Sequence, residues 1–278
     1  MENHQKETIL NLQRLLPRTP APVIYFLAGS LPGRAHLHLR KLTIFGMICR
    51  MTSNFLHSYA LNLFQHGDPP FRSWFYQILD LCKKYSLPTP LELLQNPLKK
   101  LSYKKMIKNK VIDHCERELR AEAAPLSSLV YFRPQYMSLV KTHPVWSSAG
   151  SSPSKDTMAT VQAQMLSGRY RTESLCSKWK PECTGVCLLS PLCSSTPEDL
   201  KHILQDCIAL IPTRQNLLVF TRRYCENFPD MSSLVFYFLD PSNPEYCQFL
   251  IAGSKKDSHR GTSDAKEGFC SIGRFGKK

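Results

Sequence analysis

Hydrophobic residues recur every three or four positions along much of the chain, a spacing that places them on one face of an α-helix. The stretch 35–51, for example, sets Leu37, Leu42, Phe45 and Ile48 among basic and polar residues. Strand-like alternation is scarce, and no internal repeat of fixed period occurs. We therefore predict a mainly α fold, with helices over residues 7–16, 35–51, 54–65, 71–85, 98–122, 156–167, 211–228 and 243–251.

The composition changes between the predicted helices in a way that divides the chain. Residues 133–155 hold Pro134, Pro144 and Pro153 together with a serine-rich run, and this composition predicts a linker. The linker would separate a helical region over residues 1–132 from a small zinc-knuckle-like helical module over residues 156–252. Glycine, serine and charged residues then predict a disordered tail over residues 253–278.

The charge of the chain indicates what kind of partner it has. Its 278 residues include 36 lysine and arginine residues against 22 aspartate and glutamate residues, giving a net charge of +14 and a pI near 9.3. Such a field favours polyanions, so we expect RNA or DNA, bound with weak sequence preference. No stretch approaches the ~20 apolar residues of a membrane helix, so no membrane contact is expected. Residues 1–6 lack the apolar core of a signal peptide, which predicts an intracellular protein of the nucleus or cytoplasm without disulfides.

Five of the 11 cysteines crowd into residues 176–207, and this clustering suggests a metal site. Cys187, Cys193, His202 and Cys207 supply three thiolates and one imidazole, a set that closes a tetrahedron around zinc and leaves no position for water. We therefore predict a structural zinc ion. Two alternatives stay open: Cys183 can replace Cys193 as the partner of Cys187, and the cysteines can be reduced residues packed in a small helical core.

A helix is expected to begin directly after Cys193. Thr196 is a good N-cap, Pro197 suits the first helical position, and the two acidic residues that follow complement the positive end of a helix. His202 would lie on this helix. At about 100° per residue, His202 and Cys207 would be about 140° apart around it, so they can share a metal only if the helix ends or bends near residue 205 or 206.

A run of lysines is the first candidate for nucleic-acid contacts. Lys100, Lys104 and Lys108 recur every four residues of the predicted helix over 98–122, so they form a stripe that can contact successive phosphates. A solvated helix face is the alternative.

The second candidate combines an aromatic ring with two cations. Arg169, Tyr170 and Arg171 place a ring between two guanidinium groups, a combination that binds phosphate and stacks on bases. The alternative is a helix end followed by a solvated loop.

The sequence lacks the usual signatures of catalysis. It contains no Gly-x-Ser-x-Gly elbow, no phosphate-binding glycine loop and no dinucleotide-binding fingerprint. His36 and His38 are two residues apart on a predicted helix, so they face differently and are not expected to share a metal. We therefore assign no catalytic residue and expect neither enzymatic activity nor a small-molecule substrate.

Several segments taken together resemble one protein family. The motifs are Leu31-Pro32-Gly33, the stretch 38–48, Ser73-Trp74-Phe75, Cys82, the stretches 119–122, 146–153 and 164–172, and the set Cys187, Cys193, His202 and Cys207. In this order they are similar to the C-terminal region of the reverse transcriptase proteins of LINE-type (non-LTR) retrotransposons. The similarity extends over roughly residues 6–250.

The resemblance implies a helical region that follows the polymerase palm and ends in the zinc-binding motif of the family. In the family the polymerase core lies upstream, with its metal-binding aspartates in an aromatic-x-Asp-Asp turn, whereas this chain contains no Asp-Asp pair. We therefore expect a noncatalytic nucleic-acid-binding fragment without polymerase or endonuclease cores. The alternatives are a helical protein-interaction module with a structural zinc site and a nonfunctional remnant of a retroelement.

Overall fold

The computed structural model describes residues 2–129, 131–146, 149–213 and 215. These residues are mainly helical, as the hydrophobic periodicity predicts, and apart from one isolated β-bridge they contain no strand. The α-helices are α1 (Glu2–Leu12), α2 (Ala21–Ala28), α3 (Gly33–Arg50), α4 (Phe55–Gln65), α5 (Trp74–Lys84), α6 (Pro90–Gln95), α7 (Lys100–Ala123), α8 (Pro153–Leu166) and α9 (Glu173–Cys176). Shorter 3₁₀ turns are η1 (Ser127–Leu129), η2 (Pro134–Tyr136), η3 (Pro144–Trp146), η4 (Pro191–Cys193) and η6 (Ile208–Leu210).

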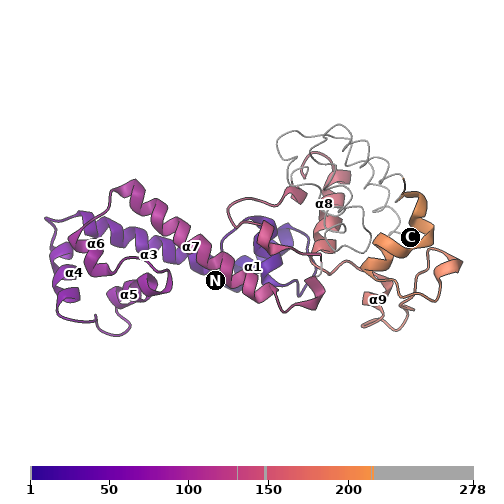
Figure 1. The fold of residues 1–278 in the computed structure, drawn as a ribbon, viewed down its shortest axis with the longest axis horizontal. Helices are drawn as coiled ribbons and strands as arrows, with labels where there is room; N and C mark the ends of the chain where they lie inside the picture. Colours follow the sequence, from indigo (N-terminus) through magenta and orange to yellow (C-terminus); the bar gives the residue numbers. More distant parts are fainter. Residues whose placement is uncertain (1, 130, 147–148, 214, 216–278) are drawn as a thin grey trace, which may run out of the picture.

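The helices follow one another along an elongated molecule (Figure 1). Helices α3 to α6 and the first half of α7 form one end, which we call the basic lobe (residues 33–110). Helices α1 and α2 and the second half of α7 occupy the middle, and α8 and the cysteine-rich segment form the other end. The predicted lysine stripe and the predicted metal site therefore lie on different parts of the molecule.

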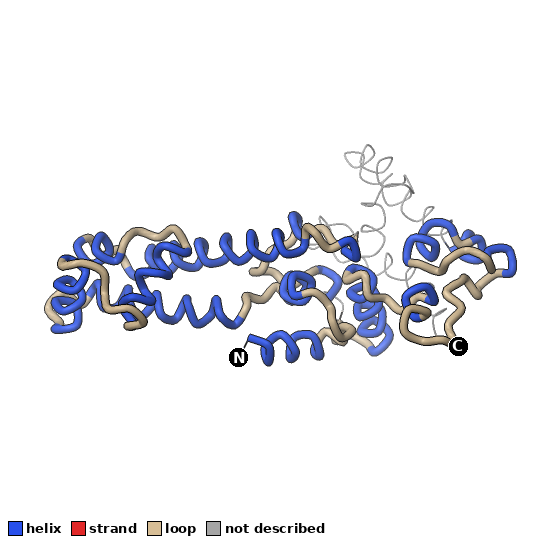
Figure 2. The backbone as a smooth tube through the Cα atoms, turned by 90° about the horizontal axis from the view of Figure 1, so that it is seen from below, coloured by secondary structure: helices blue, strands red, loops and turns tan. Residues whose placement is uncertain are grey.

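Helices α3 and α7 run side by side through the basic lobe (Figure 2). Tyr103 of α7 is 2% exposed, and its hydroxyl group donates a hydrogen bond to the Leu42 carbonyl oxygen of α3 at 2.8 Å. Its ring lies against Gly46, where a Cβ would fall within 2.8 Å of three ring carbons. Glycine at this position therefore permits the close approach of the two longest helices.

A buried polar contact ties α3 to the residue that follows α5. The hydroxyl group of Tyr85, which is 3% exposed, is hydrogen-bonded to Nδ1 of His38 at 2.6 Å. Burial, followed by the positive charge of Lys84, lowers the pKa of His38 from its usual 6.5 to about 4. His38 therefore makes this contact as a neutral imidazole.

The segment expected as a linker over residues 133–155 is packed over much of its length. Leu139 and Val145, together with Phe132 just before the segment, are 2–3% exposed and join the same hydrophobic core as the helices. The backbone N–H of His143 donates to the Leu27 carbonyl oxygen at 3.1 Å. Over the described residues 133–146 and 149–152, the segment's regular elements are the two 3₁₀ turns η2 and η3. Over residues 133–146 the segment is nevertheless part of the core, because the apolar residues between the prolines are buried.

Three short helices, α2, α6 and the four-residue α9, are missing from the sequence-based prediction, and α2 and α6 share one feature. Proline lies in the first turn of both, Pro22 in α2 and Pro90 in α6, where its lack of an N–H costs nothing. Thr89 and Glu92 form a capping box at the start of α6. The first helix, predicted over residues 7–16, already ends at Leu12, and α2 begins within the proline-rich stretch that follows.

The other predicted helices fall into two groups. The five long ones between residues 35 and 167 correspond to α3, α4, α5, α7 and α8. The predicted helix over 211–228 is described only at its start, and the helix over 243–251 and the tail over 253–278 lie outside the described residues. Within the described residues, every helix is too short or too polar to cross a membrane.

Candidate metal centre

A short hairpin positions the first cysteine of the cluster. The chain bends at Gly185, whose φ of +78° suits glycine, and an isolated β-bridge joins Val186 to Pro197. The backbone N–H of Cys187 donates to the Thr196 carbonyl oxygen at 2.9 Å. Cys187 is thereby held next to the segment that leads to the other ligands.

The second cysteine lies in the 3₁₀ turn η4, inside the loop of this hairpin. The side-chain oxygen of Ser190 accepts a hydrogen bond from the Leu192 N–H at 3.2 Å and so begins the turn. The Thr196 N–H donates to the Cys193 carbonyl oxygen at 2.9 Å and closes it. These bonds direct the Cys193 side chain back toward Cys187.

The helix that carries His202 begins later than the sequence predicts. Thr196 and Pro197 belong to the hairpin, and helical residues start at position 200. The carboxylate of Asp199 accepts a hydrogen bond from the His202 backbone N–H at 2.7 Å, so Asp199 is the cap. The assignment of Thr196 as N-cap is wrong because its backbone pairs with Cys187 instead.

His202 and Cys207 reach the same side of the chain through a π-helical turn, η5 (His202–Asp206). The backbone N–H of Cys207 donates to the His202 carbonyl oxygen, five residues back, at 2.7 Å. A turn closed between residues i and i+5 is wider than an α-helical turn and brings those two residues above each other. The helix ends there, because Cys207 is extended (φ −60°, ψ 118°). The turn thus meets the requirement that the helix end or bend near residue 205 or 206.

The four side chains converge on one point. The Cys187 sulfur is 3.4 Å from that of Cys193 and 3.8 Å from that of Cys207, and the last two sulfurs are 4.0 Å apart. With a ring nitrogen of His202, the four ligand atoms all lie within 4.8 Å of one another. In tetrahedral geometry with Zn–S bonds of about 2.3 Å, two sulfurs lie about 3.8 Å apart. The cluster therefore has the dimensions of a four-ligand metal site.

The cluster is closed to solvent. Cys187 and Cys207 are 0% exposed, His202 is 3% exposed and Cys193 is 4% exposed. Neither ring nitrogen of His202 has a hydrogen-bond partner, and an unsatisfied buried polar group costs about 1–3 kcal/mol. A metal ion bound to one ring nitrogen would satisfy that nitrogen and remove its share of this cost.

Two of the sulfurs differ in how readily they ionise. Burial raises the pKa of the Cys187 thiol to about 12, although the Leu189 backbone N–H donates to its sulfur and opposes the rise. Burial also opposes ionisation of Cys193, but contacts with the other two thiols and a hydrogen bond from the Ile208 N–H lower its pKa. A divalent ion supplies the positive charge that three neighbouring thiolates need.

The remaining two cysteines of the crowded stretch lie outside the cluster. Cys176 and Cys183 are half-buried, and neither supplies an atom to the four-ligand group. No disulfide joins any of the described cysteines, so none competes for the cluster among them. Of the two alternatives that the spacing allows, the geometry brings Cys193 and not Cys183 next to Cys187.

The lysine stripe lies where the sequence places it. Lys100, Lys104 and Lys108 are exposed on successive turns of α7, beside a neighbouring face on which Tyr103 and Ile107 are buried. The stripe is therefore a surface feature of the basic lobe. Its contact with phosphate stays a prediction.

The arginine–tyrosine–arginine segment lies between the helical core and the metal cluster. Gly168, with φ +65°, turns the chain against the Ser128 carbonyl oxygen. Tyr170 is partly buried against both the main core and the cysteine cluster, and burial raises its pKa. Arg169 is half-buried and Arg171 is exposed. Tyr170 therefore connects the two parts of the structure, and its stacking on a base stays a prediction.

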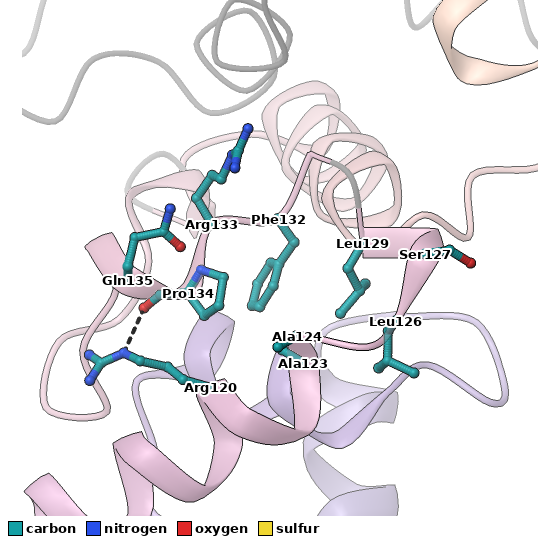
Figure 3. Close-up of a pocket in the computed structure, with 10 residues that line it drawn as sticks. All are labelled: Arg120, Ala123, Ala124, Leu126, Ser127, Leu129, Phe132, Arg133, Pro134 and Gln135. Atoms are coloured by element: carbon teal, nitrogen blue, oxygen red, sulfur yellow. Dashed lines mark hydrogen bonds between the residues drawn. The ribbon is translucent and has the colours of Figure 1, made fainter.

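A surface cavity of about 480 Å³ lies at the C-terminal end of α7 (Figure 3). It is lined by Arg120, Ala123, Ala124, Leu126, Ser127, Leu129, Phe132, Arg133, Pro134 and Gln135. The Arg120 guanidinium is already engaged, since it donates to the Pro134 carbonyl oxygen at 3.2 Å and pairs with Glu116 at 2.6 Å. The lining includes no carboxylate, histidine or cysteine, so it offers no acid–base pair and no activated nucleophile.

No family model, curated protein or solved structure matches the chain. The resemblance to LINE-type reverse transcriptase proteins therefore rests on the sequence motifs alone.

Proposed function

We propose that the protein is a noncatalytic nucleic-acid-binding fragment of a retrotransposon reverse transcriptase, held at its C-terminal end by a structural zinc ion. The observation that carries the zinc assignment is the convergence of Cys187, Cys193, His202 and Cys207 within 4.8 Å. Three thiolates and an imidazole suit zinc better than magnesium or calcium, which prefer oxygen ligands. Four buried protein ligands leave no open position, so the ion would stabilise the fold and bind no substrate.

Metal content tests this assignment directly. We expect one zinc per wild-type chain, and none or a large reduction in His202→Ala and Cys207→Ala. Cys183→Ala is the matched control, because this cysteine lies outside the cluster and its loss should leave the stoichiometry unchanged. Chelation of the wild type should unfold the cysteine-rich segment, since the ion supplies much of the folding energy of a small metal module. Unchanged zinc in both ligand variants would refute the site.

Nucleic-acid binding is supported by the exposed lysine stripe of the basic lobe. Residues 33–110 contain 13 lysine and arginine residues and only three acidic residues, so this end of the molecule carries most of the net charge of +14. Each lysine of the stripe would neutralise about one phosphate and release its counterion. Such binding is strongly salt-dependent and weakly selective for sequence.

A salt titration of binding to duplex and single-stranded probes tests this role. Replacing Lys100, Lys104 and Lys108 by serine should weaken binding to all sequences alike and lower the slope of log affinity against log salt by up to ~3. The control replaces Lys141, Lys178 and Lys201, which are exposed outside the lobe, and so removes the same charge elsewhere. Equal effects of the two triple variants would show that only net charge matters and would refute the stripe.

A helical protein-interaction module is the second candidate function. Ile44, Met47 and Met51 are 45–52% exposed and follow one another along one side of α3 and its C-cap residue. Such an apolar row suits a partner helix, whose binding depends weakly on salt. This function would be favoured if the chain bound no nucleic acid but bound a protein partner in a salt-independent way, and if Met47→Ser abolished that binding.

A further inference from the structure

Three large aromatic side chains are exposed on the basic lobe. Phe55 is 78% exposed, Phe71 is 73% exposed and Tyr59 is 49% exposed. Phe55 and Tyr59 lie one turn apart on α4, with their ring centroids 6.1 Å apart and their planes within 24° of parallel. We call these three residues the aromatic platform.

The platform is attached to the core of the lobe. The Tyr59 ring lies 6.0 Å from that of Phe75 on α5, and Phe75 in turn packs at 5.1 Å against Trp74. Phe55 is therefore the outer end of a row of rings that begins in the core. A ring held in this way loses little freedom when a ligand covers it.

A cation lies next to the third ring. The Arg72 guanidinium lies 5.5 Å from the centroid of the Phe71 ring, and Tyr76 packs edge-on against the same ring at 5.2 Å. An aromatic ring for a base and a guanidinium for a phosphate are thus offered side by side.

The charge around the platform decides which partner fits it. Helix α4 has no charged residue of its own, but the lobe that carries it has 13 lysine and arginine residues against three acidic ones. Helices α4 and α7 both pack against α3, so the platform and the lysine stripe belong to the same end of the molecule (Figure 1). A polyanion that also presents flat, unpaired rings complements both features, and single-stranded nucleic acid has this chemistry.

We propose that the aromatic platform stacks on unpaired bases of single-stranded nucleic acid while the lysine stripe binds its phosphates. The proposal rests on the nucleic-acid-binding function and adds the form of the strand and the place where its bases lie. Duplex bases are already stacked on one another, so the platform acts on single strands alone. Because every base has a π face, the contact is tolerant of sequence.

Fluorescence anisotropy with a labelled oligothymidylate of about 20 nucleotides tests the platform, since one binding fold covers ~4–16 nucleotides. Phe55→Ala and Tyr59→Ala should each weaken binding to this strand by roughly 5- to 150-fold, with little change in affinity for a duplex of equal length. Phe55→Trp should retain binding. Leu101→Ala is the matched control, because Leu101 is 79% exposed on the same lobe but has no ring.

The outcomes separate this proposal from the function on which it rests. The platform would be refuted if Phe55→Ala and Tyr59→Ala bound the single strand with wild-type affinity. Weakened binding in the triple lysine variant would at the same time leave nucleic-acid binding in place. No binding of either probe by the wild type would overturn both. An equal loss for strand and duplex would also refute stacking. A change of oligomeric state in Phe55→Ala without any effect on the strand would assign the platform to a protein contact.

Discussion

The close approach of α3 and α7 makes Gly46→Ala an informative perturbation of the fold. At an exposed position inside a helix, this substitution stabilises by about 0.8–1.0 kcal/mol, because alanine has the higher helix propensity. At position 46 the new methyl group would lie within 2.8 Å of three carbons of the Tyr103 ring. The ring is 2% exposed, so no open space exists for it to enter.

The expected loss can be assembled from three contributions. Overpacking of a well-filled core costs about 1–3 kcal/mol. Displacement of the ring would break the 2.8 Å hydrogen bond from Tyr103 to Leu42 and leave a buried hydroxyl unsatisfied, at about 1–3 kcal/mol. The gain in helix propensity offsets about 1 kcal/mol. Gly46→Ala should therefore lower the free energy of unfolding by about 1–5 kcal/mol.

Urea denaturation followed by far-UV circular dichroism measures this effect as a lower midpoint at an unchanged slope. Gly33→Ala at the start of α3 is the matched control, because its Cβ would meet only the flexible end of the Gln5 side chain. In a double-mutant cycle, Tyr103→Leu removes the ring and should restore about 1–3 kcal/mol of the loss caused by Gly46→Ala. Wild-type stability of Gly46→Ala, or strict additivity with Tyr103→Leu, would refute the packing argument.

Two further predictions concern other contacts. Gly168→Ala should destabilise by more than about 1 kcal/mol, because the residue has φ +65° and its Cβ would clash with the Ser128 carbonyl oxygen; thermal unfolding that matches the wild type would contradict this. The pKa of His38 is lowered from 6.5 to about 4. Between these two pH values the folded state therefore binds fewer protons than the unfolded state. The free energy of unfolding should fall as the pH is lowered from about 6.5 to 4. His38→Gln should flatten this part of the pH profile, whereas a change at exposed His36 should not; equal profiles in the two variants would exclude the burial of His38 as the cause.

Helices such as α5 and α7 could be predicted because each buries an apolar face, which leaves a period in the sequence. Helix α2 left no such period, since almost all its residues are apolar and buried, and the prolines around it suggested a helix end. The sequence pattern of residues 133–146 likewise did not show that this segment is packed in the core. Whether apolar residues between prolines are packed depends on the surfaces of α2 and α7, which local sequence does not contain.

At the metal centre, the ligand set could be predicted but its supporting geometry could not. Thr196 and Asp199 are both good caps, and only the pairing of Thr196 with Cys187 decides that Asp199 takes this role. The π-turn replaces the α-helical period that sequence arguments assume. Tyr170 similarly gave no local sign that its ring packs between two cores.

Two of the three gaps between the candidate metal ligands differ in how much change they can absorb during evolution. The loop between Cys187 and Cys193 is closed by backbone bonds, and its first and last residues, Leu188 and Leu192, are 67% and 78% exposed. Lengthening it costs only closure entropy, about 0.6 kcal/mol per doubling. The gap from His202 to Cys207 is a single turn containing buried Leu204, and one inserted residue would rotate Cys207 by about 100° away from the ion. Related chains should therefore vary freely in the first spacing and keep the second, so relatives are best recognised by a histidine and a cysteine five positions apart.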